Sequence, residues 1–377
     1  RQKIGETVRR CLTISGYFNV YGPDRYYFDP SNEGMIASTI DFQRWYNVGA
    51  SALIKTAFAH TGNQVALDFR LYSVESSEEI NIGYSNRTVP RDRVDREIYE
   101  FVNLVIRHYT GSPGVFGSRI AYTGRNANNL KQIYVTGMDG VFVSPVTNNG
   151  SINILPRWGR GGQVMYTSYV HGNPDVFVGN NNAQVVSDRP GINSGPDVSP
   201  ATGEIAITLS MHGNSEIYIL DPTGREIVRR CTDNNAEDTS PSWSPDGGQI
   251  AFTSDRSGGP QIFVMNADCS GQRRVTFAGN YNTEPDWSPQ GDRIAFTGRD
   301  SANRFDIFTV EPGTNYIERL TQDQGNNKHP SWSPDGRYLV FTSTRGGSGG
   351  ALYVMTSDGQ SQFEIMSGTY ETPVWER

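Results

Sequence analysis

The pattern of hydrophobic and polar positions repeats from Arg119 to the end of the chain. Each period contains a Pro-x-Trp anchor or a close variant, and successive anchors lie 40, 45, 44, 45 and 43 residues apart. A fixed period of this length, with four short β-prone runs in it, is typical of a β-propeller blade. The anchors occupy residues 156–158, 196–198, 241–243, 285–287, 330–332 and 373–375.

The period that starts at residue 241 shows how the pattern predicts strands. After the anchor comes Ser-Pro-Asp-Gly, in which Pro245 presets a turn dihedral and Gly247 supplies a positive φ. Three short β-prone runs follow, at 250–252, 262–265 and 273–276. Because turn-forming residues separate the runs, we predict four antiparallel strands in each period.

The two ends of the repeat array predict how the propeller closes. Residues 119–122 match the second strand of a period, whereas residues 372–375 are an anchor with nothing after it. Joined, they make one blade and leave no sheet edge open. We therefore predict an all-β, six-bladed β-propeller at 118–377, closed by pairing of the C-terminal strand with the unit at 118–150.

Residues 1–112 lack the repeat and predict a small α/β domain, one sheet backed by two or three helices. We expect the true start of the chain, with the first strand of this sheet, to precede residue 1, and residues 113–117 to be a short linker. The patterns predict helices at 4–12, 41–46 and 91–109, strands at 17–21, 52–59, 64–74 and 79–84, and a hairpin turn at 61–63.

Composition narrows the classes of function. The net charge is -7, and from residue 114 onward the chain carries 20 Lys and Arg against 27 Asp and Glu. An acidic propeller argues against nucleic acid as the partner. No apolar run in the sequence approaches the ~20 residues that a membrane span needs.

The three cysteines share no metal-ligand spacing. Cys231 lies at the end of a fourth strand, and Cys269 lies in a turn between a third and a fourth strand. These positions fall at opposite ends of a blade, so we expect no disulfide between them. We assign the thiols no role.

Together these features resemble the TolB family of the Tol-Pal system in Gram-negative bacteria. The resemblance is carried by SPSWSPDG at 240–247, QIAFTSDR at 249–256 and QIFVMNA at 261–267. A small α/β domain directly before the propeller strengthens it and extends it to the whole chain. The blade after Pro196 departs from the pattern, because Val198 replaces the anchor tryptophan and Ala-Thr-Gly replaces Asp-Gly.

The resemblance implies a non-enzymatic periplasmic scaffold that contributes to outer-membrane integrity and cell division. It implies that the peptidoglycan-associated lipoprotein Pal binds at the propeller mouth and that colicins use the same mouth. It also implies contact with TolA, through an N-terminal segment that we expect to lie outside this sequence. We expect a monomer.

Blade geometry predicts where this mouth lies. The loop from each outer strand to the next inner strand opens on the same face as the loop between the second and third strands. The resemblance places partner contacts at Ile192, Asn193, Gly195 and Thr239, although Ile192 stands where the family has a histidine. Further candidate contacts on this face are His212, Asn235, Glu237, Arg256, Asn282, Glu284, Lys328 and His329.

The sequence contains weaker signals for catalysis and metal binding. Residues 346–350 read Gly-x-Ser-x-Gly, but they lie in a predicted loop between propeller strands rather than in the strand-turn-helix of a nucleophile elbow. The histidines lack zinc-ligand spacing. Acidic residues such as Glu237 and Glu284 leave open a calcium ion in the channel, although a solvated rim explains them more simply. We expect no other cofactor. The alternative function is a propeller that regulates, or acts as, a hydrolase on peptides or glycans.

Overall fold

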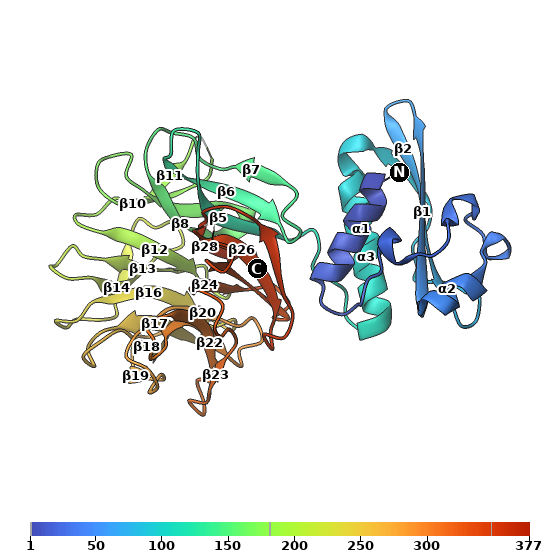
Figure 1. Ribbon diagram of the computed structural model, residues 1–377. Coiled ribbons are helices and arrows are strands. Elements are labelled where there is room, and N and C mark those ends of the chain that lie inside the picture. The colour runs from blue at the N-terminus through green and yellow to red at the C-terminus, as the bar shows by residue number, and fades with distance from the viewer. Residues whose placement is uncertain (1, 181, 348) are drawn as a thin grey trace. The chain divides into compact units, whose positions relative to one another are not determined.

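The computed structural model describes residues 2–180, 182–347 and 349–377. The chain divides into two compact units, residues 1–117 and 118–377 (Figure 1). Within the described residues, none of the helices is both long enough and apolar enough to cross a membrane.

The N-terminal unit is an antiparallel sheet backed by helices. Its long hairpin consists of β1 (Ala52–Thr61) and β2 (Gln64–Ser73), and both β3 (Glu78–Ile80) and β4 (Arg87–Pro90) pair with β2. Phe101 packs on Phe69 of β2 with ring centroids 5.2 Å apart, which buries the apolar stripe of the last helix. The α-helices are α1 (Gln2–Ile14), α2 (Phe42–Val48) and α3 (Val94–Thr110), and short 3-10 turns span Pro23–Arg25, Pro30–Asn32, Ala37–Thr39 and Arg91–Arg93.

Two strand predictions in this unit need correction. The segment 17–21, which is fully described, is not a strand. Phe18 instead packs edge-on against Tyr109 of α3, with ring centroids 5.6 Å apart. The strand predicted at 79–84 already ends at Ile80. We did not predict β4, because four residues that end in proline give too short an alternation.

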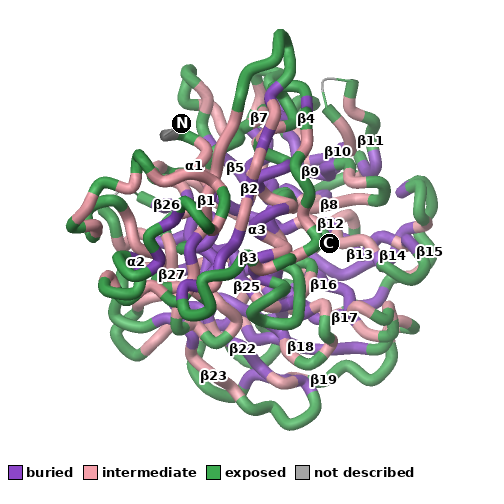
Figure 2. The backbone as a smooth tube through the Cα atoms, turned by 90° about the vertical axis from the view of Figure 1, so that its right-hand side faces the viewer, coloured by how far each residue is buried: buried purple, intermediate pink, exposed green. Residues whose placement is uncertain are grey.

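Residues 118–377 form six four-stranded antiparallel sheets among the described residues, which confirms the predicted fold class (Figure 1). We number the blades from β8 along the chain and count each blade's strands outward from the channel. Figure 2 colours the middle strands of the blades largely as buried and the connecting loops largely as exposed.

The strand bounds follow the repeat. Blade 1 holds β8 (Asn153–Trp158), β9 (Val164–Ser168), β10 (Asp175–Val178) and β11 (Gln184–Ser187), with a 3-10 turn at Arg160–Gly162. Blade 2 holds β12 (Asn193–Val198), β13 (Ile205–Leu209), β14 (Glu216–Leu220) and β15 (Ile227–Arg230). Blade 3 holds β16 (Asp238–Trp243), β17 (Gln249–Ser254), β18 (Gln261–Asn266) and β19 (Arg273–Arg274). Blade 4 holds β20 (Asn282–Trp287), β21 (Ile294–Arg299), β22 (Phe305–Val310) and β23 (Ile317–Arg319). Blade 5 holds β24 (Asn327–Trp332), β25 (Tyr338–Ser343), β26 (Ala351–Thr356) and β27 (Gln362–Met366).

Blade 6 joins the two ends of the array. It holds β28 (Glu371–Trp375) with β5 (Arg119–Arg125), β6 (Lys131–Gly137) and β7 (Val143–Pro145). Trp375 pairs with Ile120 across the junction, and its Nε1 donates to Ser118 Oγ at 2.7 Å. The C-terminal anchor therefore supplies the inner strand of the blade that the first repeat unit lacks.

At four blade junctions the anchor motif ties one blade to the next. The residue between its proline and tryptophan accepts a hydrogen bond from the backbone N–H of the following anchor's tryptophan. Such bonds satisfy backbone donors where two blades meet. The acceptors are Asp197, Ser242, Asp286 and Ser331, and the donors are Trp243, Trp287, Trp332 and Trp375, at 2.7, 3.0, 2.7 and 3.1 Å.

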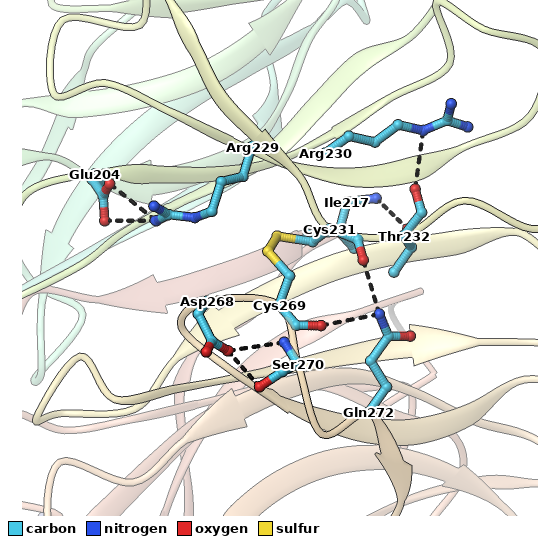
Figure 3. The surroundings of a disulfide bond; sticks show 10 residues. All are labelled: Glu204, Ile217, Arg229, Arg230, Cys231, Thr232, Asp268, Cys269, Ser270 and Gln272. Carbon is cyan, nitrogen blue, oxygen red and sulfur yellow. Dashed lines mark hydrogen bonds and ion pairs between the residues drawn. A yellow bond between two sulfur atoms is a disulfide. The ribbon is translucent and has the colours of Figure 1, made fainter.

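The prediction that Cys231 and Cys269 are too far apart for a disulfide is wrong. The two residues are disulfide-bonded, with Cα atoms 4.8 Å apart (Figure 3). Cys231 follows β15 of blade 2, and Cys269 lies in the β18–β19 turn of blade 3. Gln272 Nε2 donates to Cys231 O at 2.8 Å across the same junction.

The two positions lie at opposite ends of a blade, but the disulfide joins two different blades. The turn before a fourth strand rests on the outer strand of the preceding blade. At the junction of blades 4 and 5, the equivalent residues are Leu320 and Gly359. A Cβ atom on Gly359 would lie only 2.6 Å from Leu320 O, so the turn lies directly against the preceding blade. Positions at opposite ends of a single blade thus become neighbours between adjacent blades.

Candidate partner-binding site

Two sets of loops form one face of the propeller, which we call the mouth. One set leads from a fourth strand into the next inner strand, and the other connects the second and third strands of a blade. Hydrogen bonds join the two sets: Asn173 Nδ2 donates to Gly191 O at 2.6 Å, and Asn214 Nδ2 donates to Asn234 O at 2.9 Å. The two sets therefore lie side by side around the end of the channel.

All six inner strands have a β-bulge near the mouth. In each one the pairing register shifts, and the residue before the anchor proline takes a left-handed conformation. A bulge redirects a side chain, and left-handed non-glycine residues concentrate at functional sites. The bulge residues are Leu155, Gly195, Ser240, Glu284, His329 and Thr372, with φ between 48° and 59°.

Two of the predicted site residues contact each other among these bulge residues. His329 Nε2 lies 3.0 Å from Glu284 Oε1, and Thr297 Oγ1 donates to Glu284 Oε2 at 2.7 Å. Burial raises the pKa of Glu284, but the charge and hydrogen bond of His329, the bond from Thr297 and the charge of Lys328 together lower it to about 2. This carboxylate is therefore ionised and held in place between blades 4 and 5.

Asn193 and Asn282, which we predicted as partner contacts, are buried in the structure. The two residues are only 0% and 3% exposed. Asn193 Nδ2 donates to Arg189 O at 2.6 Å, and Asn282 Nδ2 donates to Gln261 Oε1 at 2.9 Å. The first residue of an inner strand fills the junction between two blades, so its amide is used by the fold.

Four of the predicted residues are exposed in mouth loops: Ile192, His212, Asn235 and Glu237. The Ile192 N–H donates to Ser210 Oγ at 2.8 Å, and Glu237 Oε2 accepts from the Ser215 N–H at 3.1 Å. His212 Nδ1 lies 2.7 Å from the hydroxyl of Tyr218. These bonds fix the loops and leave the four residues accessible to a partner.

Of the remaining predicted residues, Arg256 is exposed, whereas Gly195, Thr239 and Lys328 are half-buried. Gly195 and Thr239 lie on β12 and β16. Arg256 is used within blade 3, since its Nη2 lies 2.8 Å from Asp238 Oδ2. The Lys328 ammonium lies 3.9 Å from the ring centroid of Phe305.

Part of the mouth is apolar, which we did not predict from the sequence. Ile152, Tyr169 and Val170 are 42%, 38% and 43% exposed and, with Ile192 at 42%, form what we call the apolar rim. The Tyr169 N–H donates to Ile152 O at 3.0 Å, which places neighbouring loops together. Large apolar residues within predicted loops were the available signal.

Charged residues from three anchors, together with Arg377 after the last anchor, also lie at the inner strands. Arg377 Nη2 is 2.6 Å from Asp286 Oδ2. Burial raises the pKa of Asp197, while the charges of Arg157 and Arg377 lower it. Two acidic and two basic groups balance one another, so this cluster is explained by packing.

The described residues contain no group of three or more His, Cys, Asp or Glu side chains placed to hold a metal ion. In the Gly-x-Ser-x-Gly sequence at 346–350, Ser348 lies outside the described residues.

Comparisons with known proteins follow the same two-unit division. The family model described as the TolB amino-terminal domain matches residues 1–80, and that of the TolB beta propeller domain matches residues 106–377.

Relatives resemble the chain over nearly all of its length. The Tol-Pal system protein TolB of Anaeromyxobacter dehalogenans is 38% identical over 382 residues, covering 98% of this chain and 85% of the relative. The protein TolB homolog of Chlorobium luteolum is 33% identical over 380 residues, covering 99% and 85%. A match to the Desulfosudis oleivorans Tol-Pal system protein TolB, 36% identical over 224 residues, covers 59% of this chain and only 50% of that relative.

Among solved structures, TolB from Acinetobacter baumannii superposes with a TM-score of 0.83 at 25% identity, covering 100% of this chain and 94% of that one. Both units, in this order, are thus found together in a known protein. The chain belongs to the TolB family.

Proposed function

We propose that this chain is a non-enzymatic periplasmic scaffold of the Tol-Pal system that binds the lipoprotein Pal at the propeller mouth. The observation that carries the proposal is 38% identity, over 98% of the chain, to a protein named as a Tol-Pal system TolB. Through that system the scaffold would contribute to outer-membrane integrity and cell division.

The mouth supports the proposal physically. Protein interfaces combine an apolar centre with a polar periphery. The apolar rim lies on blades that neighbour the exposed polar loop carrying Asn235 and Glu237. The six left-handed bulge residues fix the inner strands beneath these loops, so a partner would meet a surface that is already ordered.

The disulfide supports the proposed compartment. Disulfides persist in oxidising environments such as the bacterial periplasm and are rare in the reducing cytosol. The Cys231–Cys269 bond joins two blades, so its formation belongs with a protein that matures outside the cytosol.

Calorimetric titration with the soluble domain of Pal from the same organism tests the proposal, with and without added calcium. We expect saturable one-to-one binding. Ile192→Arg should weaken binding at least tenfold, because it places a charge in the apolar rim. Ile227→Arg is the matched control, since Ile227 is 38% exposed on the outer strand β15, away from the mouth loops.

Equal loss of affinity in both variants would contradict a site at the mouth. Absence of binding by folded wild-type protein, with and without calcium, would contradict Pal as the partner. A dependence of affinity on calcium would favour a channel ion.

A further inference from the structure

Adjacent blades are joined by a repeated pair of buried polar side chains. One member starts the third strand of a blade, and the other starts the inner strand of the next blade. In four junctions the second member is an asparagine whose Nδ2 donates to the first. The pairs are Asn153 to Gln132, Asn193 to Asp175, Asn282 to Gln261 and Asn327 to Asp306, at 3.1, 3.5, 2.9 and 2.9 Å.

The junction between blades 2 and 3 breaks this rule. The equivalent residues are Glu216 and Asp238, two carboxyl groups that are each 0% exposed. Asn234 binds both: its backbone N–H donates to Glu216 Oε1 and its Nδ2 to Asp238 Oδ2, each at 2.8 Å. Among the described residues, Glu216 Oε2 and Asp238 Oδ1 have no hydrogen-bond partner.

The charges around the pair come from three further elements. Arg256, in the β17–β18 loop, binds Asp238 Oδ2 at 2.8 Å. Arg230 of β15 lies 3.7 Å from Glu216 Oε1 but is closer, at 2.9 Å, to Asp233 Oδ1 in the adjoining loop. Tyr218 of β14 packs beneath the guanidinium of Arg230. Three carboxyl groups thus face two guanidinium groups, which leaves one negative charge unbalanced if all three are ionised.

We infer that Glu216 and Asp238 share one proton at neutral pH, so that the junction of blades 2 and 3 is a proton-binding site. The proton supplies the donor that the asparagine amide supplies in the four junctions with an asparagine. If both carboxyl groups were ionised, they would repel each other, and Glu216 Oε2 and Asp238 Oδ1 would be buried without a donor.

The electrostatics agree with this geometry. Burial raises the pKa of Glu216, the charge of Asp238 raises it further, and hydrogen bonds from Asn234 and Thr232 oppose the rise. A carboxyl pKa that is higher in the fold than in the unfolded chain stabilises the fold at low pH. That stabilisation is lost as pH rises through the folded-state value.

The site adjoins the mouth. Asp238 directly follows the loop that carries Asn235 and Glu237, and Asn234 of that loop binds both carboxyl groups. Removal of the proton would therefore loosen this loop first. The inference does not require Pal to be the partner.

Asp238→Asn is the direct test, because it introduces the amide found at four of the other junctions. The neighbouring arginine accepts this change: in blade 5, Arg345 Nη2 donates to Asn327 Oδ1 at 3.0 Å. Difference infrared spectroscopy at neutral pH should show a protonated-carboxyl band in wild-type protein that is lost in Asp238→Asn. As pH rises from acidic to alkaline values, the free energy of unfolding of the wild type should fall relative to that of the variant. The size of the change should correspond to about one more proton released by the wild type than by the variant on unfolding.

Asn282→Asp is the matched control at the next junction. Its carboxylate would face Gln261, whose amide can donate, so no new protonated-carboxyl band should appear. Glu216→Gln should behave like Asp238→Asn and guards against a folding defect in either variant. The inference is overturned if the wild type shows no such band, if the band persists in Asp238→Asn, or if both proteins have the same pH dependence of unfolding.

Discussion

At the scale of the residue, Glu284 shows what one left-handed position does at the mouth. With φ of 59° before a proline, its backbone leaves the strand ladder and its carboxylate reaches His329 of the next blade at 3.0 Å. Although burial raises the pKa of Glu284, the charge and hydrogen bond of His329 help to lower it to about 2. The side chain is 33% exposed, so water screens part of this attraction.

Glu284→Gln should lower the free energy of unfolding at neutral pH by about 1 to 2 kcal/mol. Because the folded pKa of about 2 lies below the ordinary value of 4.5, the contribution is present above that value. It is lost as pH falls toward about 2. Urea unfolding at neutral pH and at about pH 3 measures the difference, which should shrink in acid. The exposed Glu226→Gln is the control, with an effect within about 0.5 kcal/mol; a pH-independent loss in Glu284→Gln would contradict the explanation.

At the scale of the element, the turn before each fourth strand is a docking element between blades. A Cβ on Gly359 would lie 2.6 Å from Leu320 O, and one on Gly224 would lie 2.5 Å from Val186 O. Close backbone approach explains glycine at these positions. At the junction of blades 2 and 3, a disulfide replaces this contact, with Cys269 at φ of 72°.

The disulfide closes a sequence separation of 38 residues and should stabilise the propeller by about 3 to 4 kcal/mol in the chain-entropy model. Reduction should therefore lower the wild-type melting temperature by about 5 °C or more. The double variant Cys231→Leu, Cys269→Gly copies the Leu320–Gly359 pair and should fold with a melting temperature insensitive to reductant. Scanning calorimetry with and without dithiothreitol measures both. Equal sensitivity in wild type and double variant would show that the reductant acts elsewhere.

At the scale of the whole molecule, closure of the ring joins the two ends of the repeat array. Val374 pairs with Ala121 and Trp375 with Ile120, positions more than 250 residues apart in sequence. Without β28, blade 6 would have no inner strand and β5 would present an unpaired edge. The two compact units at 1–117 and 118–377 each have a core of their own.

A fragment spanning 118–377 should fold by itself with a cooperative thermal transition, because all six blades are complete within it. The same fragment ended at residue 370 lacks β28 and should aggregate or melt without cooperativity. Circular dichroism and size-exclusion chromatography of the two fragments compare these outcomes. A cooperative, monomeric shorter fragment would show that closure is dispensable.

The sequence predicts which face of the propeller carries the candidate site, but not which side chains are exposed on that face. The loops containing Ile192, Asn235 and Glu237 follow from the order of strands in a blade. The burial of Asn193 and Asn282 does not, because it depends on which side chain the bulge leaves in the junction between blades. The apolar rim was missed for a related reason: exposed apolar residues look like core until their neighbours are known.

The sequence by itself determined the number of blades, the order of the strands and the closure of the ring. Those features depend on local turn chemistry and on a period that recurs along the chain. Only the tertiary structure decided what meets between blades, such as Cys231 with Cys269 and Glu216 beside Asp238. Such contacts join residues about 20 to 40 positions apart, and their geometry is set by how one twisted sheet packs on the next, which no local pattern encodes.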